Sequence, residues 1–100
     1  MVRKIEWTKR ALIDLEEIHE FIARDSKKYA QIQVIKIRES VSNLLEFPLM
    51  GRRVPEFPQL PYREIISGNY RVIYRYDKKE DKIYVMAVIH GKRLLNNIIQ

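Results

Sequence analysis

Three apolar runs separated by two short polar turns occupy the second half of the chain. The runs span residues 62–66, 70–76 and 83–89, and the turns read Ser67-Gly68-Asn69 and Asp77-Lys78-Lys79-Glu80-Asp81. Turns that contain glycine and asparagine between β-branched and aromatic runs are a strong signal for hairpins. The pattern therefore predicts an antiparallel meander of three strands.

Alternation along the middle run divides its side chains between two faces of the predicted sheet. Successive side chains of a strand point to opposite faces, so Tyr70 and every second residue as far as Tyr76 share one face. Arg71, Ile73 and Arg75 share the other face. We predict that the tyrosine face is buried and that the opposite face is cationic.

A helical periodicity precedes the strands. Apolar residues recur at steps of three and four in two segments, which begin after Thr8 and after Ser26, and both hydroxyls can cap a helix. Matching apolar stripes predict two helices packed as an antiparallel hairpin on one face of the sheet. The stripes comprise Ala11, Leu12, Leu15, Ile18, Phe21 and Ile22, then Ala30, Val34, Ile37, Val41 and Leu44, with Asp14, Glu16, Glu17 and Glu20 expected toward solvent.

The segments that flank the helices complete the predicted order. Residues 2–7 suit an edge strand, whereas Gly51 and three prolines within residues 49–61 preclude helix and regular strand pairing. We therefore predict one α+β domain over residues 1–100, in the order β-α-α-β-β-β. It has two layers, a helical hairpin on one face of a curved, mainly antiparallel sheet, and an uncovered opposite face.

Composition narrows the possible functions. The chain has 100 residues, no cysteine and two histidines, which excludes a disulfide scaffold, a thiolate zinc site and a cysteine nucleophile. We expect no metal and no cofactor. The sequence shows neither a signal peptide nor an apolar run long enough to span a bilayer, so we expect a cytoplasmic protein without a membrane partner.

The chain carries an excess of positive charge. Lysine and arginine number 19 against 13 acidic residues, a formal charge of +6, which favours an acidic partner. Arg63, Arg71 and Arg93 are predicted to lie together on the uncovered face of the sheet. With Lys92, they would form an anion- or target-binding surface.

An ordered set of residues runs through nearly the whole chain: Trp7, Ala11, Asp14, Leu15, Ile18, Pro48, Gly51-Arg52, Val54-Pro55-Glu56, Arg63, Tyr70-Arg71-Val72-Ile73-Tyr74 and Val88-Ile89-His90-Gly91-Lys92-Arg93. This set resembles the RelE/ParE toxin superfamily of type II toxin–antitoxin modules, in particular ParE-like plasmid stabilisation proteins. The resemblance covers nearly the whole chain and implies a toxin that a cognate acidic antitoxin neutralises within a toxin–antitoxin hetero-oligomer. It makes the tail residues Leu94, Leu95, Ile98 and Ile99 candidates for antitoxin contact.

The superfamily divides into two activities. RelE-like members cleave messenger RNA in the ribosomal A site, which requires cations around the phosphate, a base and an acid. The resemblance gives Arg71 and Arg93 the cationic role and Glu56 the role of base, and His90 could act as the acid. The functional tyrosine of RelE, however, falls at Ile99 here.

ParE-like members poison DNA gyrase by binding and need neither acid nor base. The long helical hairpin, Val54-Pro55-Glu56 and the ending His90-Gly91-Lys92-Arg93 resemble these members, and we favour this interpretation. Two alternatives stay open, a RelE-like ribosome-dependent endonuclease and a nontoxic basic binding module with a degenerate site. Glu56 could also simply pair with Arg52 or Arg53 on the surface.

Overall fold

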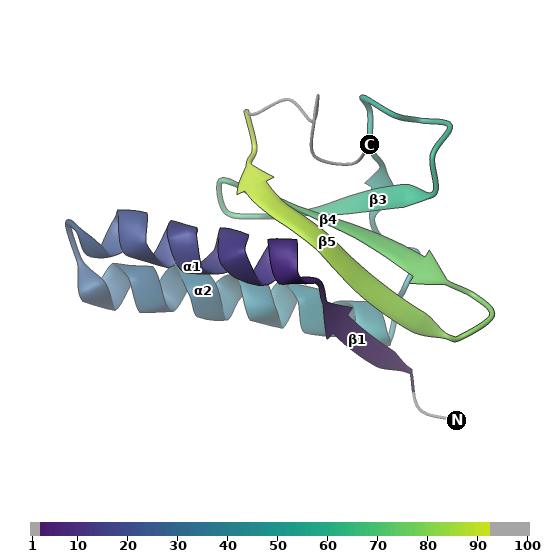
Figure 1. Cartoon of the computed structure of the whole chain (residues 1–100), viewed down its shortest axis with the longest axis horizontal. Coiled ribbons are helices and arrows are strands. Elements are labelled where there is room, and N and C mark those ends of the chain that lie inside the picture. Colours follow the sequence, from purple (N-terminus) through teal and green to yellow (C-terminus); the bar gives the residue numbers. More distant parts are fainter. Residues whose placement is uncertain (1–2, 93–100) are drawn as a thin grey trace.

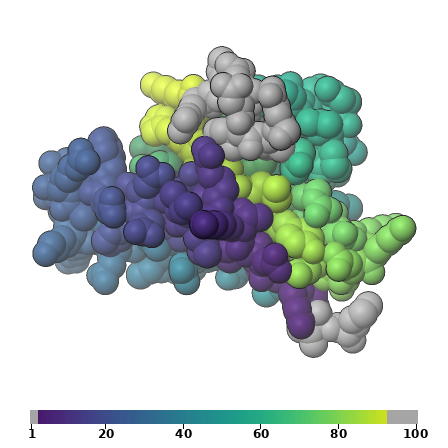
Figure 2. Space-filling view, viewed as in Figure 1, coloured from purple at the N-terminus to yellow at the C-terminus, as the bar shows by residue number. Residues whose placement is uncertain are grey.

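The computed structural model describes residues 3–92, which form two layers, a pair of helices and a sheet (Figure 1). The end of the helical pair where the first helix joins the second extends past the sheet (Figures 1 and 2). In chain order the elements are β1 (Lys4–Trp7), α1 (Lys9–Ala23), α2 (Lys27–Ser42), the 3-10 turn η1 (Asn43–Leu45), β2 (Arg52–Arg53), β3 (Tyr62–Ser67), β4 (Tyr70–Asp77) and β5 (Lys82–His90).

The sheet has five strands in the order β1-β5-β4-β3-β2. The predicted meander of β3, β4 and β5 is confirmed, and β1 lies at one edge, parallel to β5. The prediction that residues 49–61 form no regular pairing is wrong for Arg52 and Arg53, which pair antiparallel with β3. This short pairing is possible because all three prolines of the segment follow Arg53 in the chain.

Both predicted helix caps are confirmed. The Thr8 hydroxyl accepts a hydrogen bond from the Ala11 amide at 3.2 Å and donates one to the Val85 carbonyl at 2.8 Å. The Ser26 hydroxyl accepts from the Tyr29 amide at 3.1 Å. Thr8 therefore fixes the start of α1 directly onto β5, which orients the helical layer relative to the sheet.

Helices and sheet bury a common apolar core, and most of the predicted stripe residues point into it. Asp14 contradicts its predicted place toward solvent, because its carboxylate accepts the buried Val88 amide of β5 at 3.0 Å. That amide lies beyond Val85, where pairing with β1 ends. Phe21 is instead exposed. The main core comprises Ala11, Leu15, Ile37, Val41, Leu44, Ile65, Val72, Tyr74, Ile83, Val85 and Val88.

A second, smaller core covers the opposite face of the sheet. Val54, from the proline-rich segment, is fully buried there against Ile73, Ala87 and Ile89. The prediction of an uncovered face is therefore wrong. The strands β4 and β5 carry apolar side chains on both faces, and the chain after β2 folds back over the second face and buries them. Residues 54–61, called the proline-rich loop below, bring Glu56 to this face.

Neither helix within residues 3–92 has the length and apolar character needed to cross a bilayer.

Candidate functional site

A buried arginine near the start of β4 forms the centre of the candidate site. Arg71 is only 6% exposed, and it pairs with Ile66 on β3. Glu64 lies two residues before Ile66 on the same strand and is 1% exposed. Arg71 Nε donates to Glu64 Oε1 at 2.8 Å, and its Nη2 donates to the same oxygen. An arginine without a carboxylate partner at this depth would be strongly unfavourable, so the pair is a condition for burying either charge.

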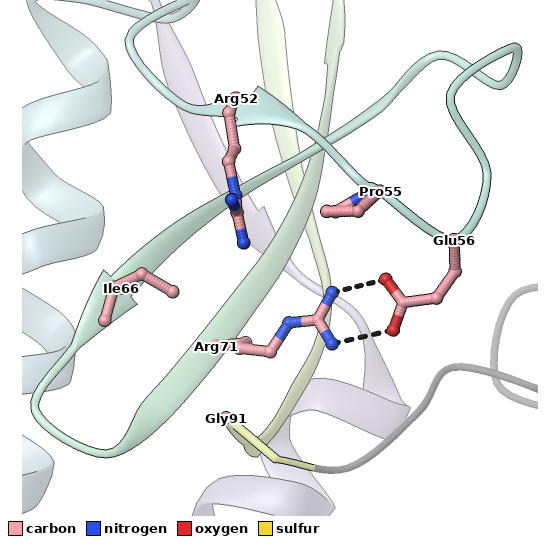
Figure 3. A pocket seen from close by; sticks show the side chains of 6 residues that line it. All are labelled: Arg52, Pro55, Glu56, Ile66, Arg71 and Gly91. Carbon is pink, nitrogen blue, oxygen red and sulfur yellow. Dashed lines mark hydrogen bonds and ion pairs between the residues drawn. The ribbon is translucent and has the colours of Figure 1, made fainter.

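The proline-rich loop supplies a second carboxylate to the same guanidinium. Arg71 Nη1 and Nη2 donate to Glu56 Oε2 and Oε1, each at 2.8 Å, in the parallel bidentate geometry drawn in Figure 3. This hydrogen bonding to Glu56, followed by that to Glu64, raises the pKa of Arg71 above its ordinary value despite burial. Arg71 therefore stays cationic at every pH at which the fold exists.

Arg52 of β2 extends the row of charges to the surface. It lies opposite Glu64 in the register, and its Nε donates to Glu64 Oε2 at 2.7 Å while most of its side chain is exposed. We call Arg52, Glu64, Arg71 and Glu56 the charge ladder. Its cations and anions alternate in space, from Arg52 through Glu64 and Arg71 to Glu56. Two arginines balance two carboxylates, so the ladder as a whole carries no net charge.

A hollow of about 380 Å³ lies beside the charge ladder. In Figure 3 the side chains of Arg52, on β2, and Arg71, on β4, approach it from the two strands that flank β3, and Glu56 faces them from the loop. The end of β5 reaches the hollow at Gly91, whose amide donates to the Asn69 carbonyl at 2.7 Å. A side chain at Gly91 would place its Cβ 3.2 Å from that carbonyl oxygen, so glycine permits this close approach. The hollow is lined by Arg52, Pro55, Glu56, Ile66, Arg71 and Gly91.

Arg63 does not join Arg71, contrary to the prediction. The register places Arg63 opposite Tyr74, and it shares a face with Ile65, which lies in the core beneath the helices. Its Nη1 donates to the Gly51 carbonyl at 2.8 Å. Arg71 pairs with Ile66 on β3 and shares its face of the sheet. Arg63 is three residues before Ile66 on that strand, an odd number, so Arg63 lies on the opposite face from Arg71.

His90 also lies away from the charge ladder. It pairs with Tyr70, and the two rings contact edge to face with centroids 5.8 Å apart, whereas Arg71 pairs with Ile89. The amide of the exposed Lys92 donates to His90 Nδ1 at 3.3 Å. His90 therefore lies on the opposite face of the sheet from Arg71, and its role as the acid of a nuclease stays a prediction. Arg93, Leu94, Leu95, Ile98 and Ile99, which the sequence assigned to target or antitoxin contact, lie outside the described residues.

Glu64 is the site residue that the sequence interpretation missed. It accepts three hydrogen bonds from two arginines, yet the sequence analysis gives it no role. A signal was present, because a carboxylate in the middle of an apolar strand is rarely buried without a cationic partner. Glu64 pairs with Ile73 on β4, and Arg71 lies two positions from Ile73 on the same face, which makes Arg71 the natural candidate for that partner.

The geometry defines what the site can do. Among the described residues, Arg71 is bound by the carboxylates of Glu56 and Glu64, and Glu64 also binds Arg52, so the charge ladder holds three strands and a loop together. The exposed end of the ladder at Arg52 and the neighbouring hollow are open to a partner.

The two-layer arrangement is the fold of the RelE/ParE toxins. It superimposes with a TM-score of 0.72 on a chain of the chromosomal ParDE system of Pseudomonas aeruginosa, at 18% identity, covering 91% of this chain and 98% of that one. It superimposes with a TM-score of 0.60 on a chain of the RelBE2 toxin–antitoxin complex of Mycobacterium tuberculosis, at 20% identity, covering 90% and 99%. These likenesses confirm the predicted fold class.

The family follows from the sequence. Residues 5–95 match the family described as "ParE toxin of type II toxin-antitoxin system, parDE", and the chain belongs to this family. It is 29% identical to Toxin RelE2 of Caulobacter vibrioides over 91% of this chain and 98% of that protein. It is 33% identical to the putative toxin Y4kP of Sinorhizobium fredii over 89% and 88%. The protein is thus a toxin of a type II toxin–antitoxin system, as the resemblance implied.

Proposed function

We propose that this toxin acts as ParE-like proteins do, by binding DNA gyrase, and that a cognate antitoxin neutralises it. The observation that carries the proposal is the charge ladder. Arg71, the arginine that a RelE-like mechanism would direct at the scissile phosphate, is bidentate with Glu56 and also bound to Glu64. The ParE family match supports the same assignment.

The ladder opposes a nuclease for two reasons. A phosphate would have to displace a bidentate carboxylate before Arg71 could stabilise its developing charge, and charge-assisted pairs of this kind are among the strongest hydrogen bonds in proteins. Glu56, the candidate base, already accepts hydrogen bonds from Arg71 at both oxygens. Loss of a positioned acid or base costs a catalyst about 10²–10⁴-fold, whereas a toxin that acts by binding loses nothing.

One observation favours the RelE-like alternative, because a relative at 29% identity carries the name RelE2. Parallel assays on the purified full-length chain distinguish the two functions. We expect loss of gyrase supercoiling and accumulation of cleaved DNA, with ribosome-bound message left intact. Intact gyrase activity together with message cut in the A site would overturn the gyrase assignment.

The antitoxin prediction is tested separately. The similar chains from P. aeruginosa and M. tuberculosis come from a ParDE system and a RelBE2 complex, and the net charge of +6 here favours an acidic partner. We expect an acidic protein encoded beside this toxin to copurify with it and to restore gyrase activity. Induced expression that leaves growth unchanged would instead favour a nontoxic binding module.

A further inference from the structure

Four large apolar side chains crowd the surface between η1 and β2. Leu45, Phe47, Leu49 and Met50 are each between 41% and 58% exposed, although they occupy only six successive positions. Residues 46–50 line a shallow, open hollow of about 360 Å³, which we call the apolar bowl. Exposed apolar side chains that gather in one hollow are a mark of a binding surface, whereas single ones are ordinary.

The backbone of the bowl is held from beneath. The hydroxyl of the buried Tyr74 donates to the Pro48 carbonyl at 2.9 Å and accepts the Gly51 amide at 3.0 Å. Arg63 Nη1 donates to the Gly51 carbonyl at 2.8 Å, and Arg3 Nη1 donates to the Leu45 carbonyl at 2.7 Å. Polar side chains from β3, from β4 and from Arg3 just before β1 thus fix the segment from inside, so its apolar side chains face outward without a loop having to be ordered on binding.

A cationic notch adjoins the bowl at Leu49. It is lined by Leu49, Arg53, Pro61, Arg63 and Tyr76. Arg53 donates to the Leu60 carbonyl and Arg63 to those of Leu49 and Gly51, and neither arginine pairs with a carboxylate within residues 3–92. Arg52, their neighbour, does have such a partner in Glu64. Among the described residues lining bowl and notch, Glu46 is the one acid, so this surface is positively charged.

We propose that the apolar bowl and the cationic notch together form a docking site for an acidic segment of another protein, with a large apolar side chain in the bowl and carboxylates on Arg53 and Arg63. Arginine beside exposed aromatic and aliphatic side chains is the composition of protein interfaces. Nucleic acid would match the notch but leave the bowl in water. A second copy of this chain would bring a like charge of +6 to the same surface. The inference does not depend on which target the toxin attacks.

The test uses the isotopically labelled full-length chain and a synthetic peptide in which phenylalanine and leucine lie between pairs of glutamate and aspartate. Peptide binding is followed by amide chemical shifts and fluorescence anisotropy. One control peptide replaces each acid with lysine, and another replaces phenylalanine and leucine with serine. We expect the largest shifts in residues 46–53 and at least about tenfold weaker binding of both control peptides.

Matched variants locate the binding. Leu49→Ser and Arg53→Glu should each weaken binding of the acidic peptide about tenfold, and both alter exposed side chains, so thermal unfolding should stay close to that of the unchanged protein. Phe21→Ser and Arg24→Glu change an exposed aromatic and an exposed arginine on α1 and should leave binding unchanged.

Three results would overturn the proposal. They are no binding of the acidic peptide above the lysine control, binding that is insensitive to Leu49→Ser and Arg53→Glu, and tighter binding of a single-stranded oligonucleotide that depends on Arg53 alone. Self-association through residues 46–50, seen by sedimentation, would identify the bowl as a contact between copies and would equally overturn it. None of these readouts involves gyrase or the ribosome, so the outcome is independent of the cellular target proposed above.

Discussion

Arg71 on β4 and Glu56 in the proline-rich loop meet through two parallel hydrogen bonds of 2.8 Å each. The loop contributes Val54 to the smaller core, so this ion pair and that apolar contact hold the same segment over the same sheet face. The pair joins residues fifteen positions apart in the chain. It explains how a loop that contains three prolines stays seated on the sheet.

Replacing Glu56 with glutamine should loosen the loop without abolishing the fold. Glutamine keeps one acceptor for Arg71 but loses the charge and the bidentate geometry, and a hydrogen bond to a charged group contributes about 1–3 kcal/mol. We expect the free energy of unfolding in urea to fall by about that amount. Glu39→Gln, at an exposed position of α2, should change it by less than about 0.5 kcal/mol.

The same variant separates the two toxin activities. If Glu56 were the base of a nuclease, Glu56→Gln would abolish toxicity while the protein remained folded. On the gyrase assignment the folded variant retains inhibition of supercoiling. Loss of all toxicity in a variant that still unfolds cooperatively would therefore count against the gyrase assignment.

Glu64→Gln should cost more than Glu56→Gln. Glu64 is 1% exposed and holds both Arg52 and Arg71, so removing its charge leaves the buried guanidinium with one carboxylate partner instead of two among residues 3–92. Breaking a buried ion pair by removing one partner is strongly destabilising, and we expect a loss of about 2–4 kcal/mol in urea unfolding. A cost equal to or below that of Glu56→Gln would show that Arg71 is held chiefly from the loop.

The fold was predictable from the sequence to the extent that its signals are local. The spacing after Thr8 and Ser26 defines the helices, and the turns around Gly68 and residues 77–81 define the meander. These depend on capping and alternation, which act within a few residues.

The errors arose where distant segments compete for one surface. Nothing local in Asp14 shows that it accepts the Val88 amide 74 positions away. Likewise, alternation along β4 correctly separates Arg71 from Tyr74, but it does not reveal that the proline-rich loop covers the arginine face or that Arg63 falls on the other one. Registers between strands and the path of an irregular loop are set by packing, which a single strand does not encode.

Gly51→Ala should destabilise the protein because the space beside Gly51 is occupied. A Cβ there would lie 2.6 Å from the Glu64 carbonyl oxygen and 2.7 Å from the Tyr74 hydroxyl. One belongs to the sheet backbone and the other to a fully buried ring, so neither can move cheaply. We expect a loss of about 1–3 kcal/mol in the free energy of unfolding. Gly91→Ala, where the nearest atom lies 3.2 Å away, should cost less.

The contact between Asp81 and Arg3 should make stability depend on pH in the acid range. The hydrogen bond from Arg3, followed by that from the Tyr76 hydroxyl, holds the pKa of Asp81 below its ordinary value of 3.8. A carboxyl whose pKa is lower in the folded state stabilises the fold fully above pH 3.8. That contribution is lost as the pH falls through the folded-state pKa.

Asp81→Asn is the suitable variant, because residue 81 adopts φ of 52° and asparagine tolerates this left-handed conformation. We expect Asp81→Asn to lower the free energy of unfolding in urea at about pH 7, and the difference from the unchanged protein to shrink as the pH drops below about 4. Arg3→Gln should show the same trend, and adding it to Asp81→Asn should remove little further pH dependence. A difference that stays constant from neutral pH to about pH 3 would mean that Asp81 has the same proton affinity in the folded and unfolded chains, and that the contact with Arg3 fixes the turn through geometry alone.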